Sequence, residues 1–316
     1  MSTAAVRTGT VLQVLRSRRA RQEALEGLFW ISPWFIGFII FTLGPILASI
    51  YLGFTDYKIG DTPVWVGLAN YRRALMQDRL FWPSMGRTAY FVFFNVTIGT
   101  MGSLIAAMLL DKVRRGLYIY RAIYYLPSLT PAVATAILWS WLLHPQVGAV
   151  NDILRKVGVA SPPGWLTSRV WANPSIVLIS LWGSIGGSRM IIFLAGLQGV
   201  PTELYEAADI DGANALQKFL RITIPLISPT TFFNVILGII GSFGVFTIAY
   251  VATTGGPNYA TWYFMLHLYY NAFEYFQMGY ASALAWLLFI IIVTLTIVQL
   301  RLSRGWVYYE FTEAAT

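Results

Sequence analysis

The sequence is poor in charge and contains no cysteine: charged residues make up only 11% of its 316 positions. The lack of cysteine excludes disulfide bonds, thiol nucleophiles and thiolate metal sites. The two histidines, His144 and His267, do not have the paired spacing of a zinc site, so no metal site is expected. Soluble proteins carry roughly 25% charged residues. The deficit therefore excludes a disordered chain, a coiled coil and a nucleic-acid-binding module with a broad basic surface.

Apolar residues make up 57% of the chain, and they form long stretches that are almost free of charge. A helix needs about 20 apolar residues to cross the hydrocarbon core of a bilayer. Six stretches meet this requirement, at residues 27–55, 88–110, 122–141, 170–197, 227–251 and 279–300. All are too apolar for barrel strands, which would alternate with a period of two. The sequence therefore predicts an all-α polytopic membrane protein with six transmembrane helices.

The fifth of these stretches belongs to a 52-residue run without charge, 222–273, which is too long for one span. The sequence Gly255-Gly256-Pro257-Asn258 interrupts this run with a strong turn signal. We therefore expect one continuous helix at 227–251 and a short re-entrant or surface helix at 262–275.

The lysines and arginines of the connections predict the orientation of the chain. With a cytosolic N-terminus, the inside segments contain 14 basic residues and the outside segments, of equal total length, contain 8. Because basic residues are retained in the cytosol, this bias predicts that both termini are cytosolic. The chain then divides into a basic tail at 1–27, a membrane domain at 28–302 and a second cytosolic tail at 303–316. The net charge of +8 follows from this topology and needs no anionic partner.

One polar connection, at 199–225 on the cytosolic side of the fourth span, has a pattern of its own. Glu203 and Glu206 suit the positive end of a helix dipole. Gly212 predicts that the first helix ends there, at a residue in the left-handed backbone conformation. Asn214, with a glutamine three residues later, predicts the cap of a second helix. We therefore expect a helix–turn–helix that lies at the membrane surface.

The same connection matches a pattern with fixed gaps: Glu-Ala-Ala, three residues, Gly, nine residues, Ile, one residue and Leu-Pro. The matching residues are Glu206, Ala207, Ala208, Gly212, Ile222 and Ile224-Pro225, where isoleucine conservatively replaces leucine. The segment, 198–226, resembles the cytoplasmic coupling loop of ATP-binding-cassette (ABC) importer permeases. The form of residues 205–213 is similar to the carbohydrate-uptake branch. Val-Gly-Leu-Ala-Asn-Tyr at 66–71 and Thr-Gly-Gly-Pro at 254–257 resemble the first, F-type permease of maltose-type and glycerol-phosphate-type importers.

This resemblance implies a non-catalytic permease subunit in the bacterial cytoplasmic membrane. The partners it implies are a second homologous permease in a heterodimer, two cytosolic ATPase subunits and an extracytoplasmic solute-binding protein, besides the lipid bilayer and without nucleic acid. The chain has no Gly-x-x-x-x-Gly-Lys-Ser/Thr motif, so ATP and Mg²⁺ are expected on the ATPase and no cofactor on this chain. The expected solute is a mono-, di- or oligosaccharide, with a phosphorylated polyol such as glycerol phosphate as the alternative.

In such permeases the short helix at the Glu-Ala-Ala sequence inserts into a groove of the ATPase. The residues to which the resemblance gives this coupling role are Glu203, Glu206, Ala207, Ala208, Asp209 and Gly212. Small alanines let the helix backbone approach closely, the acids at three-residue spacing can meet basic side chains, and glycine permits a sharp turn. The alternative is that the acids only stabilise the start of a surface helix.

Polar and aromatic residues within the spans are the candidates for the substrate path, because polar groups that face lipid are costly. They are Trp182, Ser184, Ser188 and Arg189 in the fourth span and Asn234, Ser242, Phe243, Phe246 and Tyr250 in the fifth. The resemblance implies that these two helices line a sugar site, where aromatic rings stack on sugar faces and hydroxyls and amides bond the sugar hydroxyls. For each residue the alternative is ordinary helix packing. Arg189 has two further roles open to it, snorkelling to the cytosolic interface or binding an acidic sugar or phosphate group.

Two other functional classes fit the sequence less well. An ion-coupled secondary transporter requires carboxylates or similar relays at membrane depth, and the nearest, Glu274, lies in the expected outer segment. An intramembrane enzyme would need paired carboxylates or a histidine cluster within the spans, and the sequence has neither there.

Overall fold

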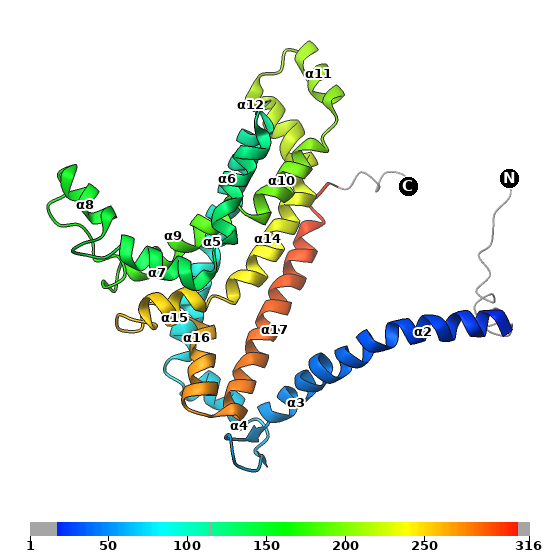
Figure 1. Cartoon of the computed structure of the whole chain (residues 1–316), viewed down its shortest axis with the longest axis vertical. Coiled ribbons are helices and arrows are strands. Elements are labelled where there is room, and N and C mark those ends of the chain that lie inside the picture. The colour runs from blue at the N-terminus through cyan, green and yellow to red at the C-terminus, as the bar shows by residue number, and fades with distance from the viewer. Residues whose placement is uncertain (1–17, 114, 309–316) are drawn as a thin grey trace.

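The computed structural model describes residues 18–113 and 115–308, and nearly all of its regular structure is helical (Figure 1). The longer helices are α2 (Arg18–Phe38), α3 (Gly44–Gly53), α5 (Phe81–Asp111), α6 (Leu117–Leu129), α7 (Ala132–Leu142), α8 (Ala149–Lys156), α9 (Ala172–Ser184), α10 (Ser188–Gln198), α11 (Thr202–Ile210), α14 (Ser228–Phe243), α15 (Thr247–Thr253), α16 (Phe264–Tyr269) and α17 (Met278–Ser303). Shorter helices are α4 (Ala69–Arg72), α12 (Ala215–Lys218) and α13 (Ile224–Leu226), and π-helical turns are η1 (Ile39–Leu43), η2 (Arg73–Gln77), η3 (Phe219–Thr223) and η4 (Tyr270–Glu274). Strands β1 (Thr55–Asp56) and β2 (Val64–Trp65) pair antiparallel. The all-α prediction is confirmed.

The helices of the described residues supply six segments of membrane-crossing length and composition when each bent pair counts as one. Three are long enough alone: Gln22–Gly53, Phe81–Asp111 and Met278–Ser303. The other three are pairs with an abrupt bend: α6 with α7 at 91°, α9 with α10 at 50°, and Ala215–Leu226 with α14 at 64°. The six-span prediction agrees with this count, but it did not include the bends.

The third span, predicted as one helix at 122–141, is instead broken between α6 and α7. Thr130 has extended backbone angles, φ −71° and ψ 127°, and Pro131 follows it. A residue before proline avoids the helical region because the proline ring collides with it. The sequence Thr130-Pro131 therefore indicates the bend, although the apolar run continues on both sides of it.

The fifth span, predicted as continuous at 227–251, ends early. Helix α14 stops at Phe243 and α15 begins only at Thr247. Gly238, Gly241 and Gly244 all fall in or just after the last turns of α14, and glycine is the least favourable helix residue after proline. The helix predicted at 262–275 is confirmed as α16 followed by η4.

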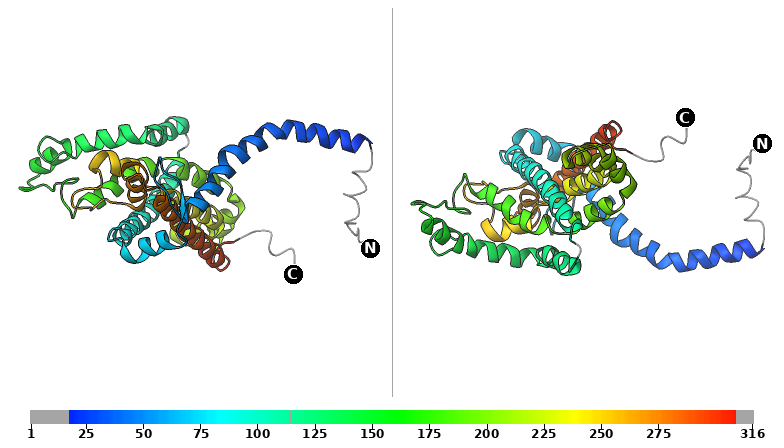
Figure 2. Two further views of the ribbon diagram at one scale, coloured as in Figure 1. Left: turned by 90° about the horizontal axis from the view of Figure 1, so that it is seen from below. Right: turned by 90° about the horizontal axis from the view of Figure 1, so that it is seen from above.

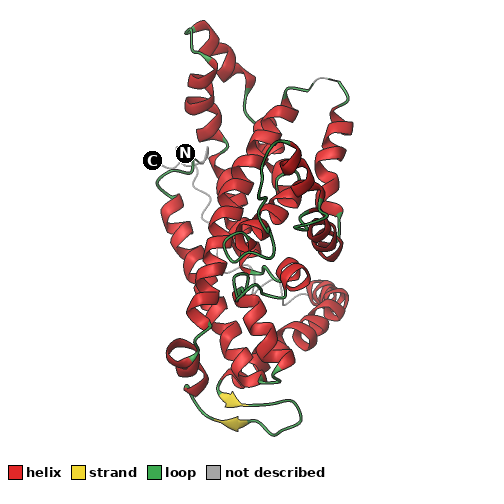
Figure 3. Ribbon diagram, turned by 90° about the vertical axis from the view of Figure 1, so that its left-hand side faces the viewer, coloured by secondary structure: helices red, strands yellow, loops and turns green. Residues whose placement is uncertain are grey.

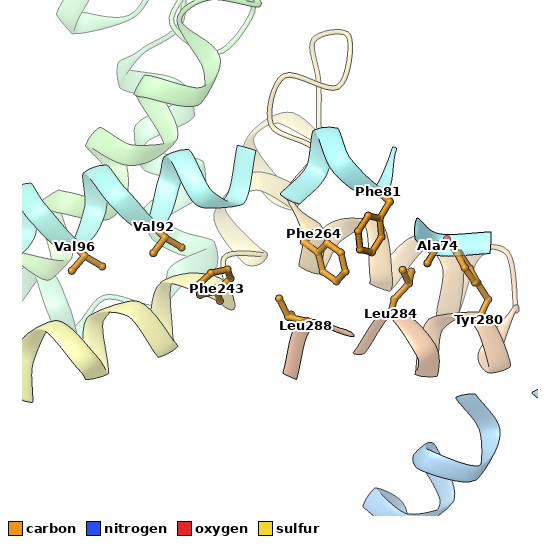
Figure 4. Close-up of a cluster of buried hydrophobic side chains, with 9 residues drawn as sticks. All are labelled: Ala74, Phe81, Val92, Val96, Phe243, Phe264, Tyr280, Leu284 and Leu288. Atoms are coloured by element: carbon orange, nitrogen blue, oxygen red, sulfur yellow. The ribbon is translucent and has the colours of Figure 1, made fainter. Parts of the chain in front are cut away.

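Helix α5 lies at the centre of the bundle and contacts α9, α10, α14 and α16. At its first half, its side chains join a buried cluster with residues from α14, α16 and α17 (Figure 4). Phe81 packs edge-to-face on Phe264, with ring centroids 5.4 Å apart. Apolar burial of this kind contributes about 25 cal/mol per Å² in water. In a membrane, close packing takes over that role, and the cluster fixes the helices that flank the site.

Helix α2 extends away from the bundle on one side, while α6, α7 and α8 lie on the other (Figure 2). None of the apolar window within Gln22–Gly53 is buried by this chain, and the segment joins the bundle at α3, which packs on α17 and also contacts the hairpin and α4. The helix begins at Arg18, ahead of residue 28, where the sequence placed the start of the membrane domain. The remainder of the two predicted tails, 1–17 and 309–316, lies outside the described residues.

The two ends of the bundle carry different structures. The strand hairpin lies at one end (Figure 3), close to α4, and α11 lies at the opposite end (Figure 1). In the predicted orientation the hairpin end is extracytoplasmic and the α11 end is cytosolic.

A buried polar cluster ties together the segments at the hairpin end. The Nε2 atom of His267 donates a hydrogen bond to Oδ2 of Asp78 at 2.8 Å, and the hydroxyl of Tyr280 donates to the same oxygen. The Nδ1 atom of His267 accepts from the indole N–H of Trp262 at 3.2 Å. Burial lowers the pKa of His267 and Arg73 adds to this, against the opposing effect of Asp78. The imidazole is therefore neutral at pH 7, and a second proton on Nδ1 would face the indole N–H.

We expect the folded protein to lose stability as the pH falls below about 6.5, the ordinary pKa of histidine. The unfolded chain takes up a proton on His267 at a higher pH than the folded chain does, so acid favours unfolding. The pKa of Asp78 is also lowered: burial would raise it, but bonds from Tyr280, Leu80 and His267 outweigh this. Its contribution has the same sign and is lost near and below pH 4.

The measurement is the thermal unfolding temperature of the purified chain in nanodiscs between pH 7.5 and 5.5. The matched control is His267→Gln, whose amide does not titrate. At pH 7.5 this variant should unfold at a lower temperature than the wild type. Its unfolding temperature should, however, change less with pH. An equal slope in both proteins would assign the effect to other groups.

Candidate functional site

Three breaks in the helices meet at one cavity of about 320 Å³. Its wall contains Ala132 at the α6–α7 break, Arg189 in the first turn of α10, and residues 244–247 between α14 and α15. Helix α5 contributes Phe91 and Asn95. Non-helical backbone at membrane depth is tolerated where it is buried in protein or lines a cavity. The cavity is therefore the place in this chain where a polar solute can meet backbone groups within the membrane.

Arg189 enters this cavity from α10 and extends its guanidinium between α5 and α14. Its Nη1 atom donates to the backbone oxygen of Asn95 at 3.4 Å. Two glycines make room: a Cβ atom on Gly99 would lie 2.5 Å from Nη1, and one on Gly238 would lie 3.0 Å from Nη2. Both glycines are in mid-helix, so the charge lies within the bundle. This position argues against the snorkelling interpretation of Arg189.

Asn95 connects the cavity wall to α14. Its Nδ2 atom donates to Oγ of Ser242 at 2.9 Å. Its Oδ1 atom is buried and has no hydrogen-bond partner among the described residues. An unpaired acceptor in an enclosed site costs free energy, so this oxygen is available to a hydroxyl of a bound solute.

An aromatic group borders the cavity where α15 begins. Phe246 stacks on Tyr250 with ring centroids 5.3 Å apart and an interplanar angle of 16°. The ring of Tyr269 in α16 contacts both: its centroid lies 4.9 Å from that of Phe246 and 5.3 Å from that of Tyr250. Rings held in this way present a rigid apolar face beside polar groups.

The structure brings only some of the predicted path residues together. Arg189, Ser242 and Phe246 line the cavity, and Tyr250 stacks behind Phe246. The other five do not line the cavity. Trp182 packs on Trp139, and the hydroxyl of Ser184 donates to the backbone oxygen of Leu181. Phe243 is part of the core, Asn234 is buried elsewhere, and Ser188 is exposed. For Trp182, Ser184 and Phe243, the packing alternative accounts for the contacts.

Sequence reasoning missed the part of the wall that α5 supplies. Asn95 is an amide in the middle of the apolar run 88–110, and this polarity was a usable signal. Phe91, Ser180 and Thr247 also line the cavity, but nothing in the sequence distinguishes them from ordinary packing residues.

The helix–turn–helix prediction for 199–225 is confirmed by α11 and α12. Gly212 has a φ of +74°, the left-handed conformation that closes a helix and that glycine adopts without steric cost. Asn214 and Gln217 form the predicted capping box, with bonds of 2.9 and 2.8 Å. The hydroxyls of Tyr205 and Thr223 lie 2.8 Å apart and tie α11 to η3.

No residue of α11 is buried by the described part of the chain. Ile210 has 87% of its surface exposed at the end of this helix. Asp209, one of the acids expected to meet a partner, forms an ion pair with Lys218 of the same chain at 2.6 Å. Glu203 and Glu206 have no ion pair among the described residues. The exposed helix therefore offers a partner two unpaired acids and two large apolar side chains, Leu204 and Ile210.

Comparison with known protein families identifies the family of this chain. Residues 99–307 match the model of the family described as "Binding-protein-dependent transport system inner membrane component". The chain belongs to this family. It is an ABC transporter permease, a multi-pass protein of the inner membrane, and the resemblance of its coupling loop is confirmed.

Two relatives match this permease over almost its whole length. "Probable ABC transporter permease protein YesP" of Bacillus subtilis is 39% identical over 94% of this chain and 96% of the relative. "Trehalose/maltose transport system permease protein MalF" of Thermococcus litoralis is 34% identical over 92% of this chain and 97% of the relative.

Among solved structures, one described as a "bacterial ABC transporter involved in the import of the acidic polysaccharide alginate" has a TM-score of 0.79. It is 22% identical and covers 92% of the permease and 99% of the solved chain. At this identity the match shows the fold, and the six-span bundle with its coupling helix is that of an importer permease.

Proposed function

We propose that the permease forms half of the path by which a saccharide crosses the cytoplasmic membrane, driven by ATP hydrolysis on a partner subunit. The observation that carries this proposal is the relative named for trehalose and maltose, which is 34% identical over 92% of the chain. Family membership excludes the ion-coupled alternative. The relatives described above favour a saccharide over the phosphorylated polyol.

The central cavity supports this solute class. It presents the groups that a sugar needs: a hydroxyl on Ser242, the free acceptor of Asn95 and the aromatic group at Phe246. Aromatic rings pack against the apolar faces of sugar rings, and buried polar groups gain from bonding their hydroxyls. We assign Arg189, Ser242, Phe246 and Tyr250 to the substrate path.

The exposed α11 supports the coupling role. Glu203 and Glu206, with the small Ala207 and Ala208, form a surface that another subunit can approach closely. Asp209 acts within the chain, since its bond to Lys218 closes the turn after α11. Gly212 sets the direction of that turn. Closure of two cytosolic ATPases would move α11 and with it the bundle.

The proposed assembly contains a second homologous permease, two ATPases that bind ATP and Mg²⁺, and an extracytoplasmic solute-binding protein. Both termini are then cytosolic, which places α11 on the side of the ATPases. The apolar surface of Gln22–Gly53, which this chain leaves uncovered, gives the second permease and the lipid a large area to contact.

The test is reconstitution of the permease with the second permease, ATPase and solute-binding protein encoded beside it, in proteoliposomes loaded with ATP. We expect uptake of a saccharide such as maltose or trehalose that depends on hydrolysis and on the binding protein. Vesicles loaded with a non-hydrolysable ATP analogue are the control. Saccharide uptake by this chain alone, without ATP, would contradict the proposal.

A further inference from the structure

Arg189 faces the central cavity, and Arg87 and Arg169 face another one; none of these arginines has an ion-pair partner among the described residues. Arg87 and Arg169 face a second cavity of about 320 Å³ at the outer end of α5, together with Asn173 and Ala260. A cation without a counter-charge is costly when it is removed from water, above all within a membrane. The partly buried Arg87 and Arg189 therefore favour an anion, and Arg169, which is exposed, adds positive charge beside Arg87.

Between residues 18 and 308, the part of the chain that the structure describes supplies no such anion around the central cavity. None of its 14 acidic residues falls within 88–110, 172–198 or 228–253, the segments that surround Arg189. Arg189 also occupies the first turn of α10, where the helix dipole already favours negative charge and disfavours a cation. A bound anion would offset both costs, and the planar guanidinium suits a carboxylate in particular.

Arg87 and the guanidinium of Arg189 lie along the same side of α5. Arg87, Phe91, Asn95 and Gly99 follow each other at intervals of one helical turn, and the guanidinium of Arg189 lies against Asn95 and Gly99. Eight residues of helix correspond to about 12 Å. The Nη1 atom of Arg87 is buried without a hydrogen-bond partner among the described residues. Cationic groups without a counter-charge therefore lie near both the outer end and the middle of α5.

The geometry points to an acidic saccharide, one with a carboxylate on its sugar ring, as the solute of this permease. Arg87 and Arg169 attract it at the outer end, and Arg189 binds its carboxylate in the central cavity. Asn95, Ser242 and Phe246 contact the neutral parts of the same molecule. This inference rests on the proposed function and narrows it from saccharides in general to those that contain a uronate.

The test compares two disaccharides that differ only at C6, α-1,4-linked digalacturonate and α-1,4-linked galactobiose. Equilibrium binding of each is measured on the complete transporter in nanodiscs, without the solute-binding protein. We expect digalacturonate to bind about tenfold more tightly or better, a difference that a single charge-assisted contact can supply. Added salt should weaken its binding and leave that of galactobiose unchanged.

Variants then assign the effect to the residue. Arg189→Gln should lose most of the preference for digalacturonate over galactobiose, and Arg189→Lys should retain part of this preference. Arg221→Gln, which removes an exposed arginine near the coupling loop, is the matched control and should keep the full preference.

A variant Arg189→Gln that binds both disaccharides as the wild type does would overturn the inference. So would a variant that loses both equally or no longer assembles, because Arg189 would then pair with a carboxylate of the second permease. ATP-driven uptake of neutral saccharides with no preference for digalacturonate would overturn the acidic solute and leave the proposed function standing. Absence of ATP-driven uptake of every saccharide would contradict the proposed function itself.

Discussion

Valine in place of Gly212 is expected to leave the permease in the membrane but to reduce ATP-driven uptake by about tenfold or more. Gly212 has a φ of +74°, and side-chain-bearing residues pay about 1–2 kcal/mol for this conformation, with β-branched residues the least tolerant. No atom lies within 4 Å of the position a Cβ atom would take. The change therefore acts through the backbone turn after α11 and not through a clash.

The matched control for this change is Gly212→Asn, because asparagine tolerates the left-handed conformation. It should retain most of the uptake. Glu206→Lys should give the same uncoupling as valine by reversing an exposed charge on α11. The measurements are permease abundance in the membrane, ATPase subunit bound per permease, and uptake. Normal ATPase binding together with normal uptake in Gly212→Val and Glu206→Lys would refute the coupling role.

Valine at Gly186, in the break between α9 and α10, is expected to be the most damaging change near the cavity. A Cβ atom there would lie 1.9 Å from the backbone oxygen of Tyr124 and 2.8 Å from its carbonyl carbon. Because the obstacle is backbone, α6 must move away from the α9–α10 break. Overpacking of this kind costs about 3 kcal/mol or more, so we expect a much lower unfolding temperature and loss of uptake.

Gly241→Ala is the matched control for the change at Gly186. Gly241 lines the cavity, and apart from the local backbone no atom of the described residues lies within 4 Å of its Cβ position. Alanine within α14 should be neutral or stabilise the helix by up to about 1 kcal/mol. Thermal unfolding of both variants in nanodiscs distinguishes them. Equal stability of the two would mean that the α6 contact at Gly186 is not tight.

The number of spans and the coupling helix could be predicted from the sequence because each depends on local patterns. Span count follows from the length of apolar runs, and the turn at Gly212 and the cap at Asn214 follow from the conformations those residues favour. The breaks were missed for a related reason. Hydropathy is the same on both sides of Thr130-Pro131 and of Gly244, so an apolar count passes over them, although proline and glycine indicate each one.

The composition of the central cavity was the least predictable part. Polarity in an apolar span identified Arg189 and Ser242, but it could not distinguish them from Ser184, whose hydroxyl bonds to its own helix. Phe91 and Thr247 join the wall only because three helix breaks meet beside α5. Such convergence depends on the tertiary arrangement, and one sequence does not contain it.

Helix α5 runs without a break over 31 residues, a length of about 46 Å. Its last turns pack Ala107 and Leu110 in a cluster with Val200 and Tyr205 beside the coupling loop, and Phe81 is fixed at the other end. Because α5 is packed at both ends and has no break, a shift of one end should move the whole helix as a rigid body. Spin labels at the two ends of α5 should therefore report one concerted rotation during the ATPase cycle, with α5 as the lever that links the cytosolic ATPase to the outer mouth.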